Sequence, residues 1–282
     1  MKRLISLAHL TVIELAPPDV VSAAAAAGYD CVDLRLAKAI PEDTLYPVFG
    51  DTPMRRELQR RLADTGVKVF DIELVRLRRG TAIGDYFALM ETGAVLGAQR
   101  LKVAADEPDE AAFTDKLAEL AEAARPFGLT VDLEFMPFTE IRTLAQAVRV
   151  VQKVRAQQPN CCVLIDSLHL SRSGGHPSDL AGLDVSLFQY VQWCDAPAAI
   201  PPDLHAIAHE ARTARMLPGE GGLPLADLLR QLPPDRPVSL ELPLREMAKT
   251  VGPQERAARA IAAARRLLAT LESGATAVIP RT

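Results

Sequence analysis

The chain has 282 residues, of which 49% are hydrophobic and 24% are charged, a balance typical of a globular protein with ample core material. Its net charge of -4 offers no broad attraction for nucleic acid or for an anionic membrane surface, which disfavours both kinds of partner. The apolar start of the chain is broken by His9 and Glu14, and no window approaches the roughly 18 uninterrupted apolar residues of a membrane span.

Strand-like and helix-like segments alternate along the whole chain. The apolar runs predict strands at 4–8, 31–36, 67–75, 100–104, 130–136, 161–168, 190–194 and 237–242. Helical patterns lie between them at 18–27, 52–65, 85–96, 110–125, 144–157, 224–232 and 254–271, with a short, weakly helical connection at 177–187. Gly28, Gly66 and Gly97 each follow a helical pattern, where a left-handed residue commonly ends a helix.

Eight strands alternating with helices, without a linker, predict an α/β fold with a single (β/α)8 barrel over residues 1–272. An open doubly wound sheet is the alternative, which the lack of a Gly-x-Gly-x-x-Gly motif after any strand disfavours. The tail, 273–282, is expected to be loosely held. The four cysteines form no Cys-x-x-Cys pair and fall in strand-like runs, which indicates buried, reduced thiols in a cytoplasmic protein.

Polar residues stand at the ends of several predicted strands, and parallel barrels bind ligands at that edge. The sixth strand ends at Asp166, with His169 three residues later. The fifth and eighth strands carry Glu134 and Glu241. Glu134 is followed by Phe-Met-Pro and Glu241 by Leu-Pro, so both strands end in a glutamate, apolar residues and a proline. Three carboxylates at one mouth would repel one another unless protons or a divalent cation neutralised them. The residues therefore predict a metal site.

The remaining candidates are open to two interpretations. Either Gln192 or Asp195, on the seventh strand, could complete the ligand set. Glu134 could equally form a salt bridge at the rim, and His169 could be a hydrogen-bonded structural imidazole. His9 and Arg35 end the first two strands, where rim contacts are as plausible as substrate contacts.

Five motifs together resemble the sugar isomerase/epimerase superfamily, whose members are xylose-isomerase-like barrels. They are LEFMPFTE, VLIDSLHLSRSGG, VQWCDAP, RMLPGEGGLPL and VSLELP, and they lie between residues 133 and 243. The resemblance as a whole covers nearly the whole chain in the family's order. Each motif is weak singly, and the set is specific together. In its metal motif the chain is most similar to hydroxypyruvate isomerase, which also has Gln at the third ligand position. Ketose 3-epimerases and dehydroshikimate dehydratase belong to the same superfamily.

The resemblance implies that Glu134, Asp166, Gln192 and Glu241 ligate one divalent metal. A set of oxygen donors without imidazole suits Mn²⁺ or Mg²⁺ better than Zn²⁺. The resemblance further implies that substrate-binding residues surround the metal. We expect these to be His169, Arg215, Glu140, Glu220, Arg35 and His9. Arg212 is the alternative to Arg215, because the loop between Asp195 and Arg215 is longer than in the compact isomerases.

The expected activity is that of an isomerase or epimerase acting on a small hydroxycarbonyl or sugar-type substrate through an enediolate. Glu134 and Glu241 would flank the substrate as an acid/base pair. The alternative is a metal-dependent dehydratase of a cyclic hydroxyketone such as dehydroshikimate or an inosose. A third candidate is a sugar-binding barrel or partner subunit without activity. Related barrels are often dimers or tetramers, so a homo-oligomer is possible on this resemblance.

Overall fold

Eight parallel strands form a closed barrel in the computed structural model, which describes residues 3–272. They are β1 (Ile5–Ala8), β2 (Cys31–Arg35), β3 (Lys68–Leu77), β4 (Arg100–Ala105), β5 (Thr130–Glu134), β6 (Cys161–Asp166), β7 (Val191–Gln192) and β8 (Val238–Leu240). Each strand pairs with its sequence neighbours, and β8 closes the ring on β1. The predicted barrel is confirmed, and the alternative of an open sheet is wrong. The predicted tail, 273–282, lies outside the described residues.

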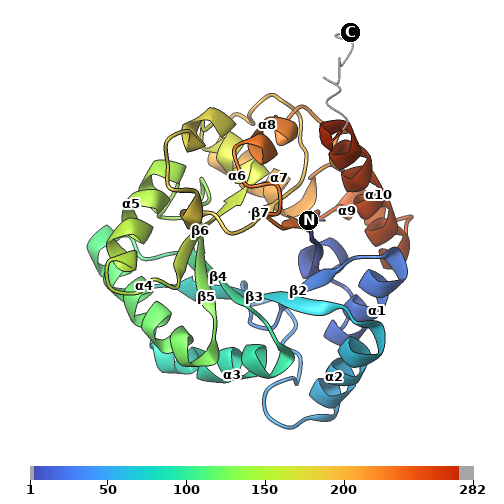
Figure 1. Ribbon diagram of the computed structural model, residues 1–282, viewed down its shortest axis with the longest axis horizontal. Helices are drawn as coiled ribbons and strands as arrows, with labels where there is room; N and C mark the ends of the chain where they lie inside the picture. The colour runs from blue at the N-terminus through green and yellow to red at the C-terminus, as the bar shows by residue number, and fades with distance from the viewer. Residues whose placement is uncertain (1–2, 273–282) are drawn as a thin grey trace.

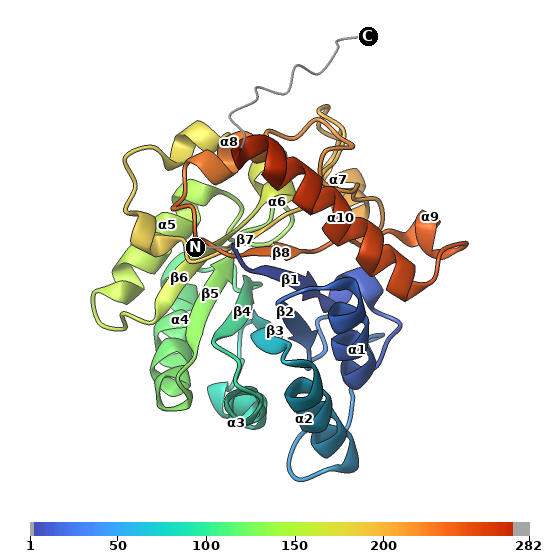
Figure 2. The same cartoon turned by 45° about the vertical axis from the view of Figure 1, so that its right-hand side comes forward.

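Helices lie outside the ring of strands (Figure 1). They are α1 (Pro17–Ala27), α2 (Pro53–Thr65), α3 (Phe87–Leu96), α4 (Glu110–Ala124), α5 (Leu144–Arg155), α6 (Ser167–Arg172), α7 (Leu204–Thr213), α8 (Leu225–Arg230), α9 (Arg245–Ala248) and α10 (Pro253–Glu272). Short 3₁₀ turns complete the connections: η1 (His9–Val12), η2 (Ile83–Tyr86), η3 (Arg125–Phe127), η4 (Pro177–Leu180) and η5 (Val185–Leu187). Helix α10 packs beside α1 and crosses the outside of the barrel from α9 to α8 (Figure 2).

The local sequence explains where the predicted helices begin and end. Thr52 caps α2 by accepting a hydrogen bond from the backbone N–H of Arg55, and Pro53 occupies the first turn, where it needs no donor. Gly28, Gly66 and Gly97 end α1, α2 and α3 with φ angles of 84°, 73° and 79°, which only glycine adopts readily.

The structure corrects the bounds of two predicted strands and adds one helix. The sixth strand ends at Asp166 and not at 168, because Asp166 accepts hydrogen bonds from the N–H groups of Leu168 and His169 and so starts helix α6. The predicted seventh strand, 190–194, is reduced to Val191–Gln192. Helix α7, which we did not predict, begins at Asp203, whose side chain accepts a hydrogen bond from the N–H of Ala206.

The apolar side chains of the strands and the inner faces of the helices form one large core. All four cysteines are buried and unpaired, as the sequence predicted. In the described part of the chain, no helix is long and apolar enough to cross a membrane.

Candidate active site

A cavity of about 140 Å³ opens at the carboxyl-terminal edge of the barrel. Its walls include Arg35 from the end of β2, Glu134 from the end of β5, His169 from α6 and Glu241 directly after β8. Because parallel strands all end at this edge, residues more than 200 positions apart in the sequence meet around one space.

Glu134, Asp166 and His169 form a group that could hold a metal ion. One ligand atom from each lies within 4.8 Å of the others, and all three residues are buried. Glu134 and Asp166 are the last residues of neighbouring strands, and His169 follows in the first turn of α6. The structure thus places His169 beside the two acids, where the sequence led us to expect a substrate contact alone.

Gln192 and Asp195, the two alternatives for a further ligand, occupy different environments. Gln192 pairs in register with Asp166, and its Nε2 donates to Glu241 Oε1 over 2.9 Å. Its Oε1 is buried and has no hydrogen-bond partner among the described residues. Asp195 instead accepts hydrogen bonds from the backbone N–H groups of Gly219 and Leu223. Gln192 therefore adjoins the cluster, whereas Asp195 holds the glycine-rich loop.

Two buried cations hold Glu241 in place. The ammonium of Lys102 lies 2.8 Å from Oε1 of Glu241, and the guanidinium of Arg215 lies 3.1 Å from Oε2. Lys102 is only 1% exposed and also contacts Glu73, whose other neighbour is Arg35. Both carboxylate oxygens of Glu241 are thereby engaged.

Arg215 joins two of the predicted metal-binding acids. Its Nη1 donates to Oδ2 of Asp166 over 2.6 Å, and its Nε donates to the carbonyl oxygen of Ala211. Arg215 lines the cavity, but most of its hydrogen-bonding capacity is used in fixing Asp166 and Glu241. Arg215 therefore holds the carboxylates of Asp166 and Glu241 in place.

Burial and neighbouring charges shift the pKa values of the central groups in different directions. Burial raises the pKa of Glu134 to about 8 against the opposing charge of Lys102. Burial would also raise the pKa of Glu241, but Lys102 and Arg215 outweigh it and hold that pKa well below its usual value. Burial lowers the pKa of His169 to about 4, so its ring is neutral near pH 7 and has a nitrogen lone pair to offer.

The buried atoms left without partners fit a bound cation. Oε1 of Glu134, Oε1 of Gln192 and Nδ1 of His169 have no hydrogen-bond partner among residues 3–272. Buried polar atoms normally have a hydrogen-bond partner, and these three atoms lack one. Each of them is of a type that can ligate a metal ion. Glu134, Asp166, Gln192 and His169 are thus the residues suited to hold a divalent ion here, with Glu241 adjoining them.

Three other predicted residues lie away from the cavity wall. His9 is fully buried; its Nε2 lies 2.9 Å from the carbonyl oxygen of Leu15, and its Nδ1 accepts from the N–H of Arg35. The side chain of Glu140 is 38% exposed and faces Arg142. Glu220 is exposed in the glycine-rich loop.

Sequence reasoning overlooked Lys102. It occupies the middle of β4, between the buried Leu101 and Val103, so period-two alternation points its side chain into the barrel. That alternation was a usable signal, because a lysine inside a barrel requires a buried anion.

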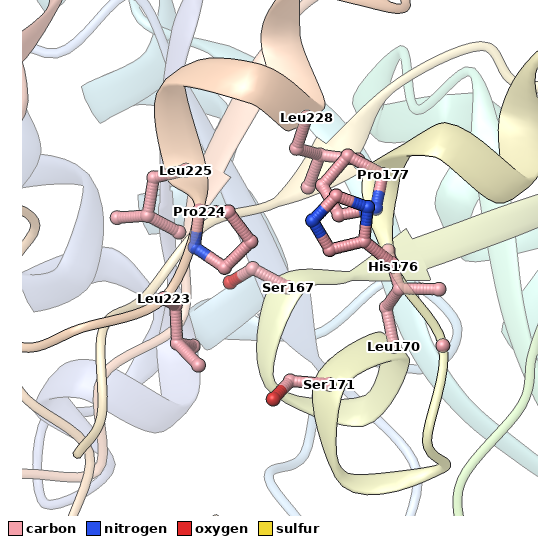
Figure 3. A pocket seen from close by; sticks show the side chains of 10 residues that line it. Ser167, Leu170, Ser171, His176, Pro177, Leu223, Pro224, Leu225 and Leu228 are labelled. Atoms are coloured by element: carbon pink, nitrogen blue, oxygen red, sulfur yellow. The ribbon is translucent and has the colours of Figure 1, made fainter. Parts of the chain in front are cut away.

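A second, smaller pocket lies between α6, η4 and α8 (Figure 3). Its walls are mostly apolar and include Leu170, Leu225 and Leu228, while the exposed His176 contacts Ser178. None of the acids of the candidate site lines it, so it offers no comparable chemistry.

Comparison with known proteins identifies the family. Residues 21–269 match the sequence profile described as the xylose isomerase-like TIM barrel. The chain belongs to this family. The family includes isomerases, epimerases and dehydratases, and the resemblance inferred from the motifs is confirmed.

Two proteins with similar sequences are named as enzymes. A 3-dehydroshikimate dehydratase of Pseudomonas aeruginosa is 31% identical over 225 residues, covering 75% of this chain and 33% of that protein. An inosose isomerase of Halalkalibacterium halodurans is 30% identical over 115 residues, covering 40% of this chain and 38% of that protein. The matched regions span 33% and 38% of the relatives' own lengths.

Among solved structures, the IolI protein with a bound zinc atom superimposes with a TM-score of 0.79 at 19% sequence identity. The match covers 95% of this chain and 99% of that one, so the two share the whole barrel.

Proposed function

We propose that this protein is a divalent-metal-dependent enzyme that removes a proton next to the carbonyl group of a small hydroxycarbonyl substrate. The observation that carries the proposal is the buried group of Glu134, Asp166 and His169, whose ligand atoms lie within 4.8 Å of one another at the barrel mouth. The structurally similar IolI protein binds a zinc atom, which supports a metal in this protein.

The protein's own side chains would divide the chemistry between them. A bound divalent ion would supply charge that polarises the carbonyl and stabilises the negative charge left after proton removal. Glu134 is the group we assign as base, because it lines the cavity and its Oε1 has no hydrogen-bond partner among residues 3–272. Glu241 has both oxygens in ion pairs with Lys102 and Arg215, which favours a fixed anionic role.

This asymmetry favours dehydration over epimerisation. Epimerisation through two carboxylates needs Glu134 and Glu241 free on opposite sides of the substrate, as we expected from the sequence. In dehydration one carboxyl suffices: Glu134 takes the proton from the carbon, the C–H electrons form the double bond, and the β-hydroxyl leaves as water by taking up that proton. The 3-dehydroshikimate dehydratase relative, which matches 75% of this chain, supports the same choice.

Isomerisation or epimerisation of a sugar-type substrate is the second candidate, supported by the inosose isomerase relative. All of these reactions share proton removal at one carbon, so the substrate and the fate of the proton decide between them. Mn²⁺ or Mg²⁺ remains our proposal for the metal if carboxylate and amide oxygens dominate the ligands, whereas ligation by His169 would widen the choice to Zn²⁺.

Turnover on a substrate panel tests the proposal. The panel contains 3-dehydroshikimate, an inosose, hydroxypyruvate and common ketoses, each assayed with the metal-free protein and with added Mn²⁺, Mg²⁺ or Zn²⁺. We expect metal-dependent loss of water from a cyclic hydroxyketone, followed by the absorbance of the conjugated product. Turnover that survives exhaustive chelation would overturn the proposal, and metal-dependent interconversion of ketoses without water loss would select the second candidate.

A further inference from the structure

The charge of the cavity wall is unbalanced. Six of the residues that line it are Lys or Arg, whereas three are Asp or Glu. Most of these cations have an anionic partner: Lys102 has Glu241 and Glu73, Arg215 has Asp166 and Glu241, Arg76 has Asp106, and Arg35 has Glu73 and Asp43.

Arg212 and Arg245 differ from the other cations of the wall. Neither has a carboxylate partner or a side-chain hydrogen bond among the residues that the structure describes. They lie on separate short helices, α7 and α9, which the antiparallel bridge between Ala214 and Leu244 ties together. The bridge sets the two helices beside each other, and both guanidinium-bearing side chains line the cavity.

An aromatic contact positions one of these groups. The guanidinium of Arg212 lies 5.1 Å from the ring centroid of Phe138, and the same ring packs edge-on against His169 at 5.5 Å. Stacking on an aromatic face leaves the N–H edges of a guanidinium free to donate. Phe138 thus connects the proton-transfer site at the cavity floor to a cation at its rim.

We propose that Arg212 and Arg245 form an anion subsite for a carboxylate on the substrate, so that the enzyme selects anionic over neutral hydroxycarbonyl compounds. The inference rests on the proposed function only where it places the reacting carbon of the substrate. Binding of a carboxylate by the two arginines does not depend on that function. A planar guanidinium matches a carboxylate with two parallel hydrogen bonds. The cavity, about 140 Å³, has room for a single-ring acid.

Equilibrium binding of an unreactive ligand pair tests the subsite without depending on catalysis. Isothermal calorimetry would compare shikimate, which carries a carboxylate but no ketone, with its uncharged methyl ester, on protein saturated with Mn²⁺ and on metal-free protein. We expect shikimate to bind at least about tenfold more tightly than the ester, since hydrogen bonds to charged groups are the stronger ones. The preference should shrink at high salt, because both arginines are exposed.

Variants assign the preference to the two arginines. Arg212→Gln and Arg245→Gln should each weaken shikimate binding about three- to tenfold while leaving the ester unchanged, and the double variant should bind both ligands equally. Arg266→Gln is the matched control, because Arg266 is exposed on α10 and outside the cavity wall. Inorganic phosphate is added as a competitor: displacement of shikimate at submillimolar phosphate would show a phosphate subsite instead and overturn the carboxylate assignment.

The outcomes separate this inference from the proposed function. Equal binding of shikimate and its ester by a protein that dehydrates hydroxyketones would overturn the subsite alone. A preference for shikimate that disappears in the double variant would support the subsite even if every substrate in the turnover panel were inert.

Discussion

The ammonium of Lys102 lies 2.8 Å from Oε1 of Glu241, across the interior of the barrel from β4 to the end of β8. The same ammonium contacts Glu73, so one lysine neutralises two buried acids. Removing one member of a buried ion pair leaves a charge that the interior cannot solvate, which costs far more than losing a surface pair.

Lys102→Met should therefore lower the free energy of unfolding by about 3–5 kcal/mol. Urea denaturation of the metal-free protein measures the loss, and Lys102→Met with Glu73→Gln should recover part of it. Lys249→Met is the control, since the exposed Lys249–Glu246 pair should change the same quantity by less than about 1 kcal/mol. Equal stabilities of the Lys102 and Lys249 variants would contradict the claim that Lys102 neutralises the buried Glu73 and Glu241.

The neutral ring of His169 makes a pH-dependent prediction. Its pKa is about 4 in the folded protein and near 6.5 when unfolded, so only the unfolded chain takes up this proton as the pH falls through that window. This group therefore makes folding less stable as the pH falls from about 6.5 towards 4. His169→Gln should flatten that part of the stability curve of the metal-free protein, while the exposed His205→Gln should not. Parallel curves for both variants would show that the ring is not held neutral.

Glu134 is the group on which turnover should depend most. With a substrate that reacts and saturating metal, Glu134→Gln should reduce kcat by about 10²- to 10⁴-fold because the base is lost. Glu140→Gln should stay near the wild-type value, since that side chain is partly exposed and outside the cavity wall. Steady-state kinetics measures both, and a comparable loss in the two variants would mean that Glu140 reaches the substrate.

The loop that follows α7 depends on a glycine for space. A Cβ on Gly221 would overlap Oδ1 of Asp195 and the carbonyl oxygen of Ala196, both held by hydrogen bonds. Gly221→Ala should lower stability by about 1–3 kcal/mol, by analogy with overpacked cores, and Gly84→Ala, which meets no neighbour within 4 Å, should be nearly neutral. Thermal unfolding of the pair tests this, and equal melting temperatures would refute the close approach.

The barrel was predictable because its signals are local and repeat. Alternating apolar runs and glycine-ended helices depend only on residues that are close in the sequence. Once the barrel is predicted, its topology alone places Asp166, Glu134 and Glu241 at one edge. The partners of those acids were not predictable, because they depend on side-chain directions across the barrel. Lys102 and Arg215 meet Glu241 from 139 and 26 residues away. Helix α7 was missed although its sequence carries a local signal, an amphipathic pattern that begins at the capping residue Asp203.

A metal titration tests the central claim most directly. Protein stripped of metal is titrated with Mn²⁺ by isothermal calorimetry, alongside Asp166→Asn and the exposed control Asp227→Asn. We predict one ion per chain for the wild type and the control, and an affinity reduced at least about 10- to 100-fold for Asp166→Asn. No binding by the wild type, or equal affinity in all three proteins, would contradict a metal centre at the mouth of this barrel.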